Sequence, residues 1–553
     1  KGLAEAVERR LVNIFNNRIT IPVVNSVQGK AVKNIRRNLS QGCPSAMNWF
    51  SYAIDPLLCY LEKRLQGIPI YSLPVHGPAE RGARRPEPLV VERYKVLGLA
   101  DDVKPSVTTM EEFNTVERGA TLFELATGNK LHRDPVKGKC KVLLLGRWRG
   151  RVQQEDIGLP HLRIVDTLAF IGVKLTASWQ KTRKENMDEL QARVKTTINS
   201  WKSGKFQPLV CRPFSVNTFC LSKIWFRTHT VDIREGDITT LTSNVKQYIY
   251  QDMFYKPSEE MLFRPVQFGG LGLHNIRCKA LASRITSFLQ TAINSKFQSS
   301  AYHSALYQYY CCKNEDEGVP PQPPYYPQSF FDIIISMKED TSLDPEKLSL
   351  KEWYKYLLEK KVTHQHALGD PALPLELRPS HREEQEPGHD WQRSYDLARR
   401  KGLDPGKKSF AFKLLNGLLP YRERLAEHQP NTSPACPHCP APQPSESSEH
   451  YFFHCGHNRE AGEAVLALLR PLDQTLDTGK ALRLDVRCDG MHETAAVLIL
   501  TTGLQLIHTN RKENKRTSVR ELTAELESLC GLLGRARARK LQETAAMVMN
   551  LIN

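Results

Sequence analysis

The sequence lacks the long apolar run of a membrane-spanning protein. Its longest nearly charge-free apolar stretch covers residues 494–507, whereas a helix needs roughly 20 apolar residues to cross a bilayer. It also lacks a visible secretory signal peptide, because its first residues are charged and amphipathic. We therefore expect no membrane partner.

A disulfide framework is absent as well. The 13 cysteines are an odd number in a long chain, and most of them are scattered. This usage is typical of a reducing compartment, so the sequence predicts an intracellular protein of the nucleus, the cytoplasm or both.

Acidic residues are outnumbered by basic ones. Lys and Arg total 77 against 60 Asp and Glu, which gives a net charge of +17 and a pI of about 9.2. A surplus of this size favours a polyanionic partner, with nucleic acid before a membrane surface, although a solvated basic surface explains the charge equally well.

The 553 residues leave room for three or more domains. Strand-like runs with one amphipathic helix give way to helical patterns, and a proline-rich break at residues 318–324 reads as a linker. The sequence predicts an α+β fold in five parts: residues 1–150, a helical region at 151–310, a linker-rich connector at 311–395, a Cys/His region at 396–460 and a helical basic tail at 461–553.

A tight turn at Gly42 and Pro44 precedes a predicted helix. Behind the turn, apolar residues recur at spacings of three and four, which is the pattern of one buried helix face. These residues are Met47, Phe50, Ile54, Leu57, Leu61 and Leu65. By itself such a loop-to-helix junction carries little functional information.

Two adjacent carboxylates, Asp101 and Asp102, follow the apolar run Val96-Leu97-Gly98-Leu99. A hairpin tip is the natural place for such a pair, because neighbouring residues of a strand point to opposite faces. Carboxylate oxygens suit Mg²⁺, and two such ions can activate a 3′-hydroxyl and stabilise the leaving pyrophosphate. A plain surface turn is the alternative interpretation.

The order and spacing of these segments resemble the reverse transcriptase palm of LINE-type (non-LTR) retrotransposons. The resemblance is carried by residues 41–44 with their helix, then 100–102, 123–131 and 139–143, and further by 170–173 and 269–273. The last two stretches match the family's palm-to-thumb hairpin and thumb-side glycine motif. The resemblance covers roughly residues 10–290 and implies a partial palm, an antiparallel sheet with helices, followed by a helical thumb.

The resemblance also implies roles for single residues. Asp101 and Asp102 match the catalytic aspartates that hold Mg²⁺ or Mn²⁺, with Asp101 the better ligand. Gln41 and Gly42 match the turn that lies along the incoming nucleotide and the template. The implied partners are an RNA template and a DNA primer.

A basic residue follows at the position where polymerases place a lysine near the triphosphate. Lys139 or Lys141 fits that position, and an ordinary surface lysine is an equal alternative.

The chain departs from the family at the third metal ligand. The family takes this carboxylate from a strand before the glycine turn, but the first aspartate here is Asp55. We therefore expect a missing N-terminal segment with the fingers, the first palm strand and, in some elements, an endonuclease. Leu99 and Ser45-Ala46 also replace the family's usual aromatic and Leu-Ser, so we expect no polymerisation by this chain alone.

Four metal-ligating residues lie within twenty positions near the C-terminal end. Their spacing, Cys-x2-Cys-x10-His-x4-Cys, suits a tetrahedral zinc site, with ordinary reduced cysteines as the alternative. The four are Cys436, Cys439, His450 and Cys455, and the rival ligands are His438, His454 and His457. With all four positions filled, the predicted zinc is structural, and its segment is expected to fold locally.

The zinc segment also resembles the zinc-binding region downstream of LINE-type polymerases, through residues 412–420 and 449–455. Some related elements follow this region with a restriction-like endonuclease that needs a Pro-Asp motif. No Pro-Asp dipeptide occurs in the chain, so no nuclease is predicted.

The tail carries clusters of cations. One contains Arg511 and Lys512, and another contains Arg535, Arg537, Arg539 and Lys540. The second cluster suits phosphate contacts and suits a solvated helix face equally well, and a nuclear import signal is a further interpretation.

The favoured function is a fragment of an RNA-directed DNA polymerase that binds template and primer with an incomplete catalytic centre. The alternatives are a non-enzymatic nucleic-acid-binding protein with a zinc knuckle, and an expressed relic without selected activity.

Overall fold

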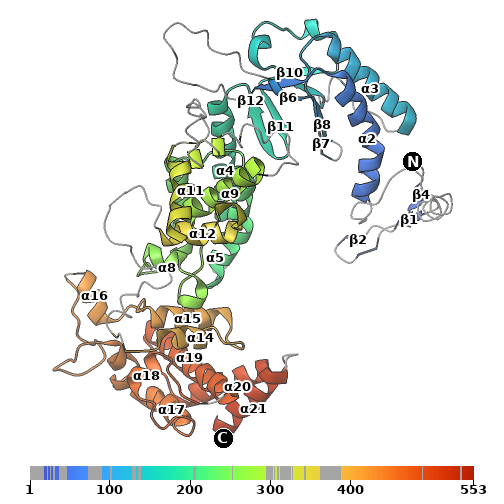
Figure 1. The fold of residues 1–553 in the computed structure, drawn as a ribbon. Coiled ribbons are helices and arrows are strands. Elements are labelled where there is room, and N and C mark those ends of the chain that lie inside the picture. The colour runs from blue at the N-terminus through green and yellow to red at the C-terminus, as the bar shows by residue number, and fades with distance from the viewer. Residues whose placement is uncertain are drawn as a thin grey trace, which may run out of the picture. The chain divides into compact units, whose positions relative to one another are not determined.

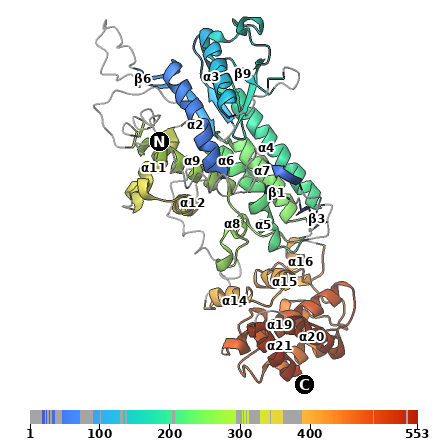
Figure 2. The same cartoon turned by 90° about the vertical axis from the view of Figure 1, so that its right-hand side faces the viewer.

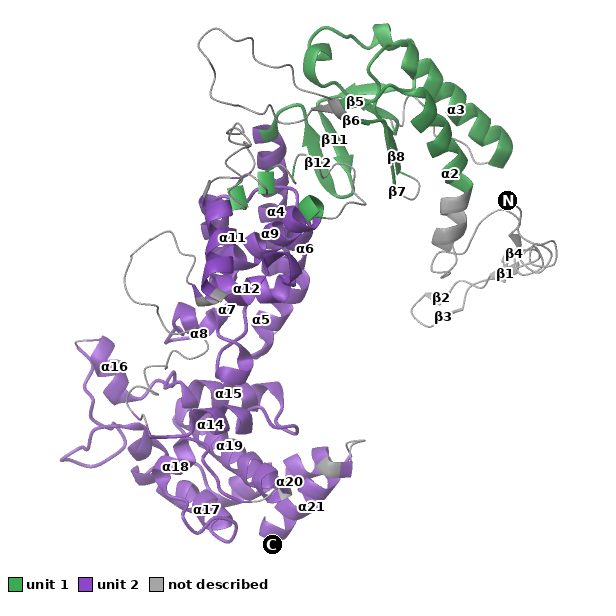
Figure 3. Cartoon of the chain, in the orientation of Figure 1, with its two compact units in different colours: residues 1–179, 291–323 green, residues 180–290, 324–553 purple. Residues whose placement is uncertain are grey.

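The structure is a computed structural model. It describes four short strands before residue 36 and residues 46–71, 90–99, 102–127, 133–134, 139–202, 207–251, 253–293, 303, 306–307, 310–311, 326, 328–341, 344–360, 386, 388–429, 431–488, 490–535 and 539–552. The contacts divide the chain into two compact units, which Figure 3 colours separately. Unit 1 comprises residues 1–179 and 291–323, and unit 2 comprises residues 180–290 and 324–553.

Unit 1 combines helices with small sheets, and each of its described sheets has two strands. Its strands are β1 (Arg18–Thr20), β2 (Val23–Val24), β3 (Val27–Gln28), β4 (Val32–Ile35), β5 (Ile68–Tyr71), β6 (Val90–Tyr94), β7 (Val96–Leu99), β8 (Asp102–Pro105), β9 (Lys141–Leu143), β10 (Arg163–Val165), β11 (Thr167–Phe170) and β12 (Val173–Thr176). Among these described strands, β9 and β10 pair in parallel and the other pairs are antiparallel. Short 3₁₀ turns lie at Gly146–Trp148 and Glu155–Ile157.

Two helices, α2 (Ala46–Arg64) and α3 (Glu111–Thr127), pack against each other in this unit (Figure 1). The predicted apolar face of the first helix is confirmed where side chains are described, since its core residues are Ile54, Leu57, Leu61 and Leu65. Gly98 lets β7 approach this helix closely, because a Cβ there would lie 2.9 Å from the Leu58 side chain. The α2–β7 packing therefore depends on the glycine before the aspartate pair.

The hairpin of β11 and β12 turns at Ile171 and Gly172. Both residues have positive φ, 47° and 74°, as a two-residue hairpin turn of type I′ requires. Phe170 pairs with Val173 across the turn. The sequence segment 170–173 is therefore a hairpin, in agreement with the prediction.

Unit 2 begins with a helical region. Its helices are α4 (Trp179–Lys202), α5 (Cys211–Ser215), α6 (Ser222–Thr228), α7 (Glu235–Ile249), α8 (Glu259–Phe263), α9 (Ile276–Ile293), α11 (Gln328–Thr341) and α12 (Leu350–Glu359), with 3₁₀ turns at Val266–Phe268 and Pro345–Lys347. A π-helical segment, Val216–Leu221, joins α5 to α6 without a break. Val194, Leu241 and Ile285 are fully buried in this region.

The glycine motif at residues 269–273 lies where this region meets the next helices. A Cβ on Gly269 would lie 2.4 Å from the ring of Tyr395, and one on Gly270 would lie 2.0 Å from the carbonyl oxygen of Arg264. Distances this short exclude any side chain without a backbone shift. The motif is thus a close-packed turn, which explains its glycines without reference to a ligand.

The C-terminal part of unit 2 is a helical assembly with one large core. Its helices are α14 (Trp391–Leu397), α15 (Pro405–Leu415), α16 (Arg422–His428), α17 (Arg459–Leu469), α18 (Thr478–Leu482), α19 (Gly490–Lys512), α20 (Val519–Gly534) and α21 (Arg539–Ile552), with a π-helical turn at His450–His454. Helices α19, α20 and α21 lie side by side in Figures 1 and 2. The most central is α19, whose residues 495–500 are all fully buried.

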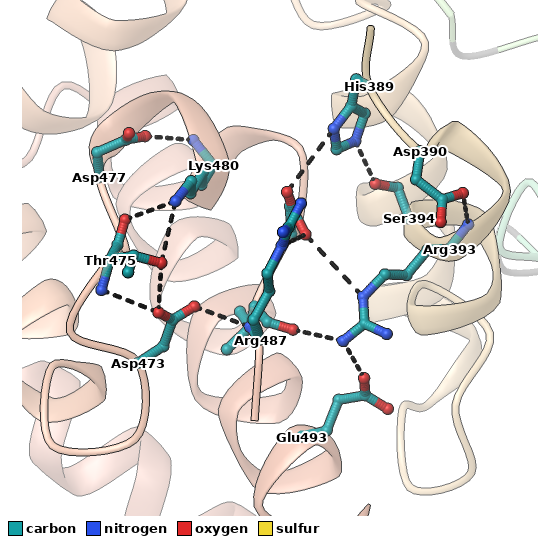
Figure 4. A network of polar contacts seen from close by, with 12 residues as sticks. His389, Asp390, Arg393, Ser394, Asp473, Thr475, Asp477, Lys480, Arg487 and Glu493 are labelled. Atoms are coloured by element: carbon teal, nitrogen blue, oxygen red, sulfur yellow. Dashed lines mark hydrogen bonds and ion pairs between the residues drawn. The ribbon is translucent and has the colours of Figure 1, made fainter. Parts of the chain in front are cut away.

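A polar network fastens α14 to this core (Figure 4). Arg393 of α14 pairs with Glu493 of α19 and donates a 2.9 Å hydrogen bond to the carbonyl of Val486. Asp473 accepts hydrogen bonds from the backbone N–H groups of Thr475 and Arg487, at 2.9 and 2.8 Å. Buried carboxylates are stable here because each has several donors.

The described residues thus form an α+β fold with many helices and small sheets, as predicted. Among them, no helix combines the length and the apolar character that crossing a bilayer requires.

Candidate metal centre

Of the aspartate pair, the structure describes Asp102, which lies in the β7–β8 hairpin. Asp102 is the first residue of β8 and pairs with Leu99 of β7. Its side chain is 55% exposed and lies 3.5 Å from the ammonium of Lys104. Asp101, Gln41 and Gly42 lie outside the described residues. No group of three metal-ligating side chains forms around Asp102 in the described part of the chain, so the Mg²⁺ site stays a prediction.

The two lysines that the sequence proposes near the triphosphate lie at the start of β9. Lys141 is its first residue, Lys139 lies just before it, and both side chains are exposed. Exposure is compatible with a phosphate contact and with an ordinary surface position, so their role also stays a prediction.

The Cys/His cluster is built on a short loop closed by backbone pairing. The Cys436 N–H donates to the carbonyl of Pro444 at 2.9 Å, and the Glu446 N–H donates to that of Pro434 at 2.8 Å. The loop brings Cys436 and Cys439 toward the π-helical turn at His450–His454. There the Cys455 N–H donates to the His450 carbonyl at 2.8 Å, which places both ligands of the turn on one side.

The four predicted ligands meet at one point. Their ligand atoms all lie within 4.8 Å of one another, and the four are Cys436, Cys439, His450 and Cys455. The Cys455 Sγ lies 3.7 Å from Cys436 Sγ and 3.9 Å from Cys439 Sγ. The Cys439 Sγ lies 3.4 Å from His450 Nε2.

These distances fit a tetrahedral zinc ion. With Zn–S bonds of about 2.3 Å and Zn–N bonds of about 2.0 Å, a regular tetrahedron has S···S edges of about 3.8 Å and S···N edges of about 3.5 Å. The three separations given above match these edges within a few tenths of an ångström, and the remaining ones are at most 4.8 Å. The four side chains can therefore surround a zinc ion after small shifts, and a zinc ion held by all four would have no coordination position open for a substrate.

Burial shifts the pKa of two of these ligands, His450 and Cys436. Burial lowers the pKa of His450, so its imidazole stays neutral, the form that binds metals. Burial also raises the pKa of the Cys436 thiol, although hydrogen bonds from the His438 backbone and from Arg511 oppose this effect. A divalent cation would favour the thiolate and release the proton.

The rival histidines stand outside the cluster. His454 is exposed, and His438 and His457 face each other with ring centroids 4.6 Å apart. The choice of His450 from its spacing agrees with the geometry of the cluster.

Aromatic residues connect the cluster to the core. Phe452 and Phe453 of the turn are buried, and the ring of Phe452 meets that of Phe410 on α15 edge-on at 6.4 Å. Helix α15 therefore packs against the turn that carries His450. The cluster belongs to the large C-terminal core, so its segment is less independent than expected.

The basic tail divides into buried and exposed cations. Arg511, which lies next to Lys512 in the first of these clusters, is 7% exposed and contacts the metal ligands. Arg535 is exposed, and Arg539 is exposed and pairs with Glu543 at 2.8 Å. Arg537 and the side chain of Lys540 lie outside the described residues. The tail's phosphate contacts stay a prediction.

Sequence reasoning missed an aromatic surface in the helical region. Phe214, Phe219 and Phe226 are 69%, 54% and 52% exposed on the continuous helix from α5 to α6. One signal was available in the sequence, because residues 190–231 contain no Asp or Glu but seven Lys and Arg. Phenylalanines without an apolar cover in an acid-free segment indicate a contact surface.

No protein-family model matches the chain. Among curated proteins, the chain is similar to the "Transposon TX1 uncharacterized 149 kDa protein" of Xenopus laevis, with 23% identity over 254 residues. The match covers 45% of this chain and 17% of that protein. The similarity points to a relation with transposon-encoded proteins.

Proposed function

We propose that this chain is part of a LINE-type retrotransposon reverse transcriptase and that it binds RNA or single-stranded DNA through its helical region. Three independent features support this origin. They are the ordered sequence motifs, the similarity to a transposon protein and a Cys₃His cluster at the spacing the resemblance implies. In this proposal residues 1–150 are palm segments, residues 151–310 are the thumb and the cluster binds structural zinc.

The aromatic surface of Phe214, Phe219 and Phe226 carries the binding part of the proposal. The π-helical segment between α5 and α6 widens the turn, so residues five and seven positions apart share one face. The opposite face is buried through Val216 and Ile224. A phenylalanine ring exposed to water is unfavourable, because its apolar surface is not buried. Unpaired bases can stack on such a ring and cover it.

The surroundings of this surface suit a polyanion. The ring of Trp201 meets that of Phe219 edge-on at 6.0 Å, and Lys223 lies on the same exposed side with its ammonium 3.3 Å from the Thr197 hydroxyl. Two other cations of the acid-free segment serve the fold instead. Arg212 and Arg227 are buried, and each donates to backbone carbonyls. Lys223 is therefore the cation to test.

The test compares three proteins for affinity to a short single-stranded RNA at two salt concentrations. Stacking contributes about 1–3 kcal/mol per base, so replacing the three surface phenylalanines by Ala should weaken binding at least tenfold with an unchanged salt slope. Lys223→Ala should lower the slope by about 0.7, the value for one phosphate on a single strand.

Phe254→Ala is the matched control, since Phe254 is 57% exposed and lies outside this surface. Wild-type affinity of the triple variant would refute the aromatic surface as the binding element, and the knuckle or the tail would replace it.

The second candidate is a non-enzymatic zinc-knuckle protein that binds nucleic acid. The complete Cys₃His cluster favours it, since all four predicted zinc ligands lie together while only Asp102 of the catalytic pair is described. Primer extension on a primed RNA template with Mg²⁺ or Mn²⁺ separates the two. We expect no synthesis by these 553 residues, because no aspartate precedes Asp55 and two-metal catalysis needs a third carboxylate. Extension abolished by Asp101→Ala would contradict this expectation.

A further inference from the structure

A buried arginine lies against the metal ligands. Arg511, near the end of α19, donates from Nη1 to Cys455 Sγ at 3.2 Å and from Nη2 to Cys436 Sγ at 3.3 Å. The same Nη2 also donates to a carboxylate oxygen of Glu446. One guanidinium therefore contacts two of the three cysteines and is anchored from its other side.

The charges explain why a cation belongs at this place. Zn²⁺ with three thiolates and a neutral imidazole carries one net negative charge, and Cys436 and Cys455 are fully buried. A buried net charge is costly unless a partner compensates it. Arg511 supplies that partner, and its planar fork can reach two sulfur atoms at once, which a lysine ammonium cannot do with the same geometry.

Glu446 fixes the orientation of the arginine. It is 4% exposed, and its carboxylate also accepts a hydrogen bond from the Arg422 N–H at 3.2 Å. The guanidinium lies over the ring of Tyr451, 5.2 Å from its centroid. The hydroxyl of Tyr451 contacts His508 Nδ1, also on α19, at 3.0 Å. The arginine thus has a single orientation, held from three sides.

These contacts join distant parts of the chain. Arg511 lies 75 positions after Cys436 and 56 after Cys455, and α19 is the central helix of the C-terminal core. Groups that hydrogen-bond to metal ligands orient them and tune their affinity. In a CCHC segment that folded alone, no such group would come from a distant helix.

We propose that Arg511 is a positioning residue of the metal centre, which holds its thiolates and couples metal occupancy to the packing of α19. The inference rests on the zinc binding of the proposed function. The N–H···S hydrogen bonds of Arg511 withdraw electron density from the sulfur atoms, and its guanidinium covers them. Loss of the guanidinium should therefore speed zinc release and expose the thiolates to electrophiles.

The experiment uses the full chain loaded with zinc. Arg511→Met removes the charge and the donors, while Arg511→Lys keeps the charge and loses the fork. Arg516→Met is the matched control, because Arg516 is 60% exposed and pairs with Glu460 on the surface. The readouts are zinc per chain, the rate of zinc transfer to a chelator and the rate of alkylation by iodoacetamide, in which an S–C bond forms and iodide leaves.

We expect both Arg511 variants to release zinc and react with iodoacetamide roughly tenfold faster or more, and Arg516→Met to behave as wild type. Wild-type rates in both variants would overturn the inference. A wild-type chain that binds no zinc would instead overturn the metal part of the proposed function.

A measurement on the wild type covers variants that do not fold. Removing zinc with a chelator should accelerate amide hydrogen exchange in the last turns of α19, around residues 504–512, as well as in residues 436–455. Acceleration confined to residues 436–455 would show that the knuckle is uncoupled from α19, and would refute the proposal.

Discussion

The Cys/His cluster and the β7–β8 hairpin are both sites that the sequence predicts, but their parts lie at different distances along the chain. All four ligands of the cluster come from residues 436–455, and the structure brings their ligand atoms within 4.8 Å of one another. The hairpin site requires Gln41, Gly42 and a further carboxylate in addition to the aspartate pair. Local spacing therefore determines the first site, whereas the second depends on how separate segments assemble.

The hydrophobic cores around the two sites differ in size, and the larger one surrounds the Cys/His cluster. The hydrophobic cluster beside the hairpin has four buried residues, whereas the cluster that contains Phe452 and α19 has 38 among the described residues. Near the smaller cluster, helix α3 leaves two leucines exposed, Leu122 at 48% and Leu125 at 79%. A large core fixes side chains in place, so the C-terminal site is the better defined of the two.

Metal removal should produce the largest effect and should affect one side only. Structural zinc contributes on the order of 10 kcal/mol to small zinc domains, which is comparable to the whole stability of a typical domain. We expect Cys436→Ser with Cys439→Ser to abolish zinc binding and to unfold much of residues 386–552, with unit 1 unchanged. Zinc content and helical circular dichroism on heating measure this.

The control for that prediction is Cys488→Ser, because Cys488 lies outside the cluster. If the double variant and the wild type melt at the same temperature and neither binds zinc, the Cys/His cluster does not stabilise the fold through a metal. The contrast between the two sites would then be refuted.

Sequence reasoning was strongest where one pattern determined one local structure. The apolar spacing of Ile54, Leu57 and Leu61 predicted α2, and the CCHC spacing predicted the ligand set. It did not reveal the contact of Arg511 with the cysteines, because a cation in a basic cluster has the same sequence signature whether it faces solvent or a sulfur atom. Only the packing of α19 on the knuckle distinguishes the two, and that packing joins residues more than fifty positions apart.

The next largest effect is expected at the glycine motif of residues 269–273. The resemblance explains these glycines as a family motif, whereas the structure explains them by close packing. Gly270→Ala places a Cβ 2.0 Å from the backbone carbonyl of Arg264, an overlap that requires a backbone shift. We expect a loss of about 3 kcal/mol or more in the free energy of unfolding, measured by urea denaturation. Gly236→Ala is the control, since no atom lies within 4 Å of its added Cβ. A wild-type denaturation midpoint for Gly270→Ala would contradict the close-packed turn.

Unit 1 has its own sensitive residue, Glu112 at the start of α3. Burial tends to raise the pKa of this carboxyl, but hydrogen bonds from the backbone of Gln66, Thr108 and Thr109 and from the Thr108 hydroxyl outweigh it and lower the pKa. A depressed pKa stabilises the fold above the unfolded value and loses that contribution as pH falls through the folded value.

Glu112→Gln should therefore lower the free energy of unfolding of unit 1 by about 1–3 kcal/mol at pH 7. The difference from wild type should shrink as the pH falls below about 4. Hydrogen exchange in α3 at pH 7 and pH 3 measures both values, and α19 serves as the internal control. A pH-independent difference would mean that the carboxylate charge contributes nothing.

The smallest effect is expected at the exposed tail, where the comparison concerns binding and not folding. Arg535 and Arg539 are exposed, and Arg539 pairs with Glu543, a neighbour on its own helix. Replacing both by Ala should leave zinc content and melting unchanged, because an exposed pair contributes at most about 1 kcal/mol. If the two arginines contact phosphates, the salt slope of RNA binding should fall by about 1.4, twice the value of one contact on a single strand.

Lys347→Ala is the matched control, since Lys347 is 84% exposed outside the tail. An unchanged slope would make this segment a solvated helix face and would leave the aromatic surface and the knuckle as the binding elements.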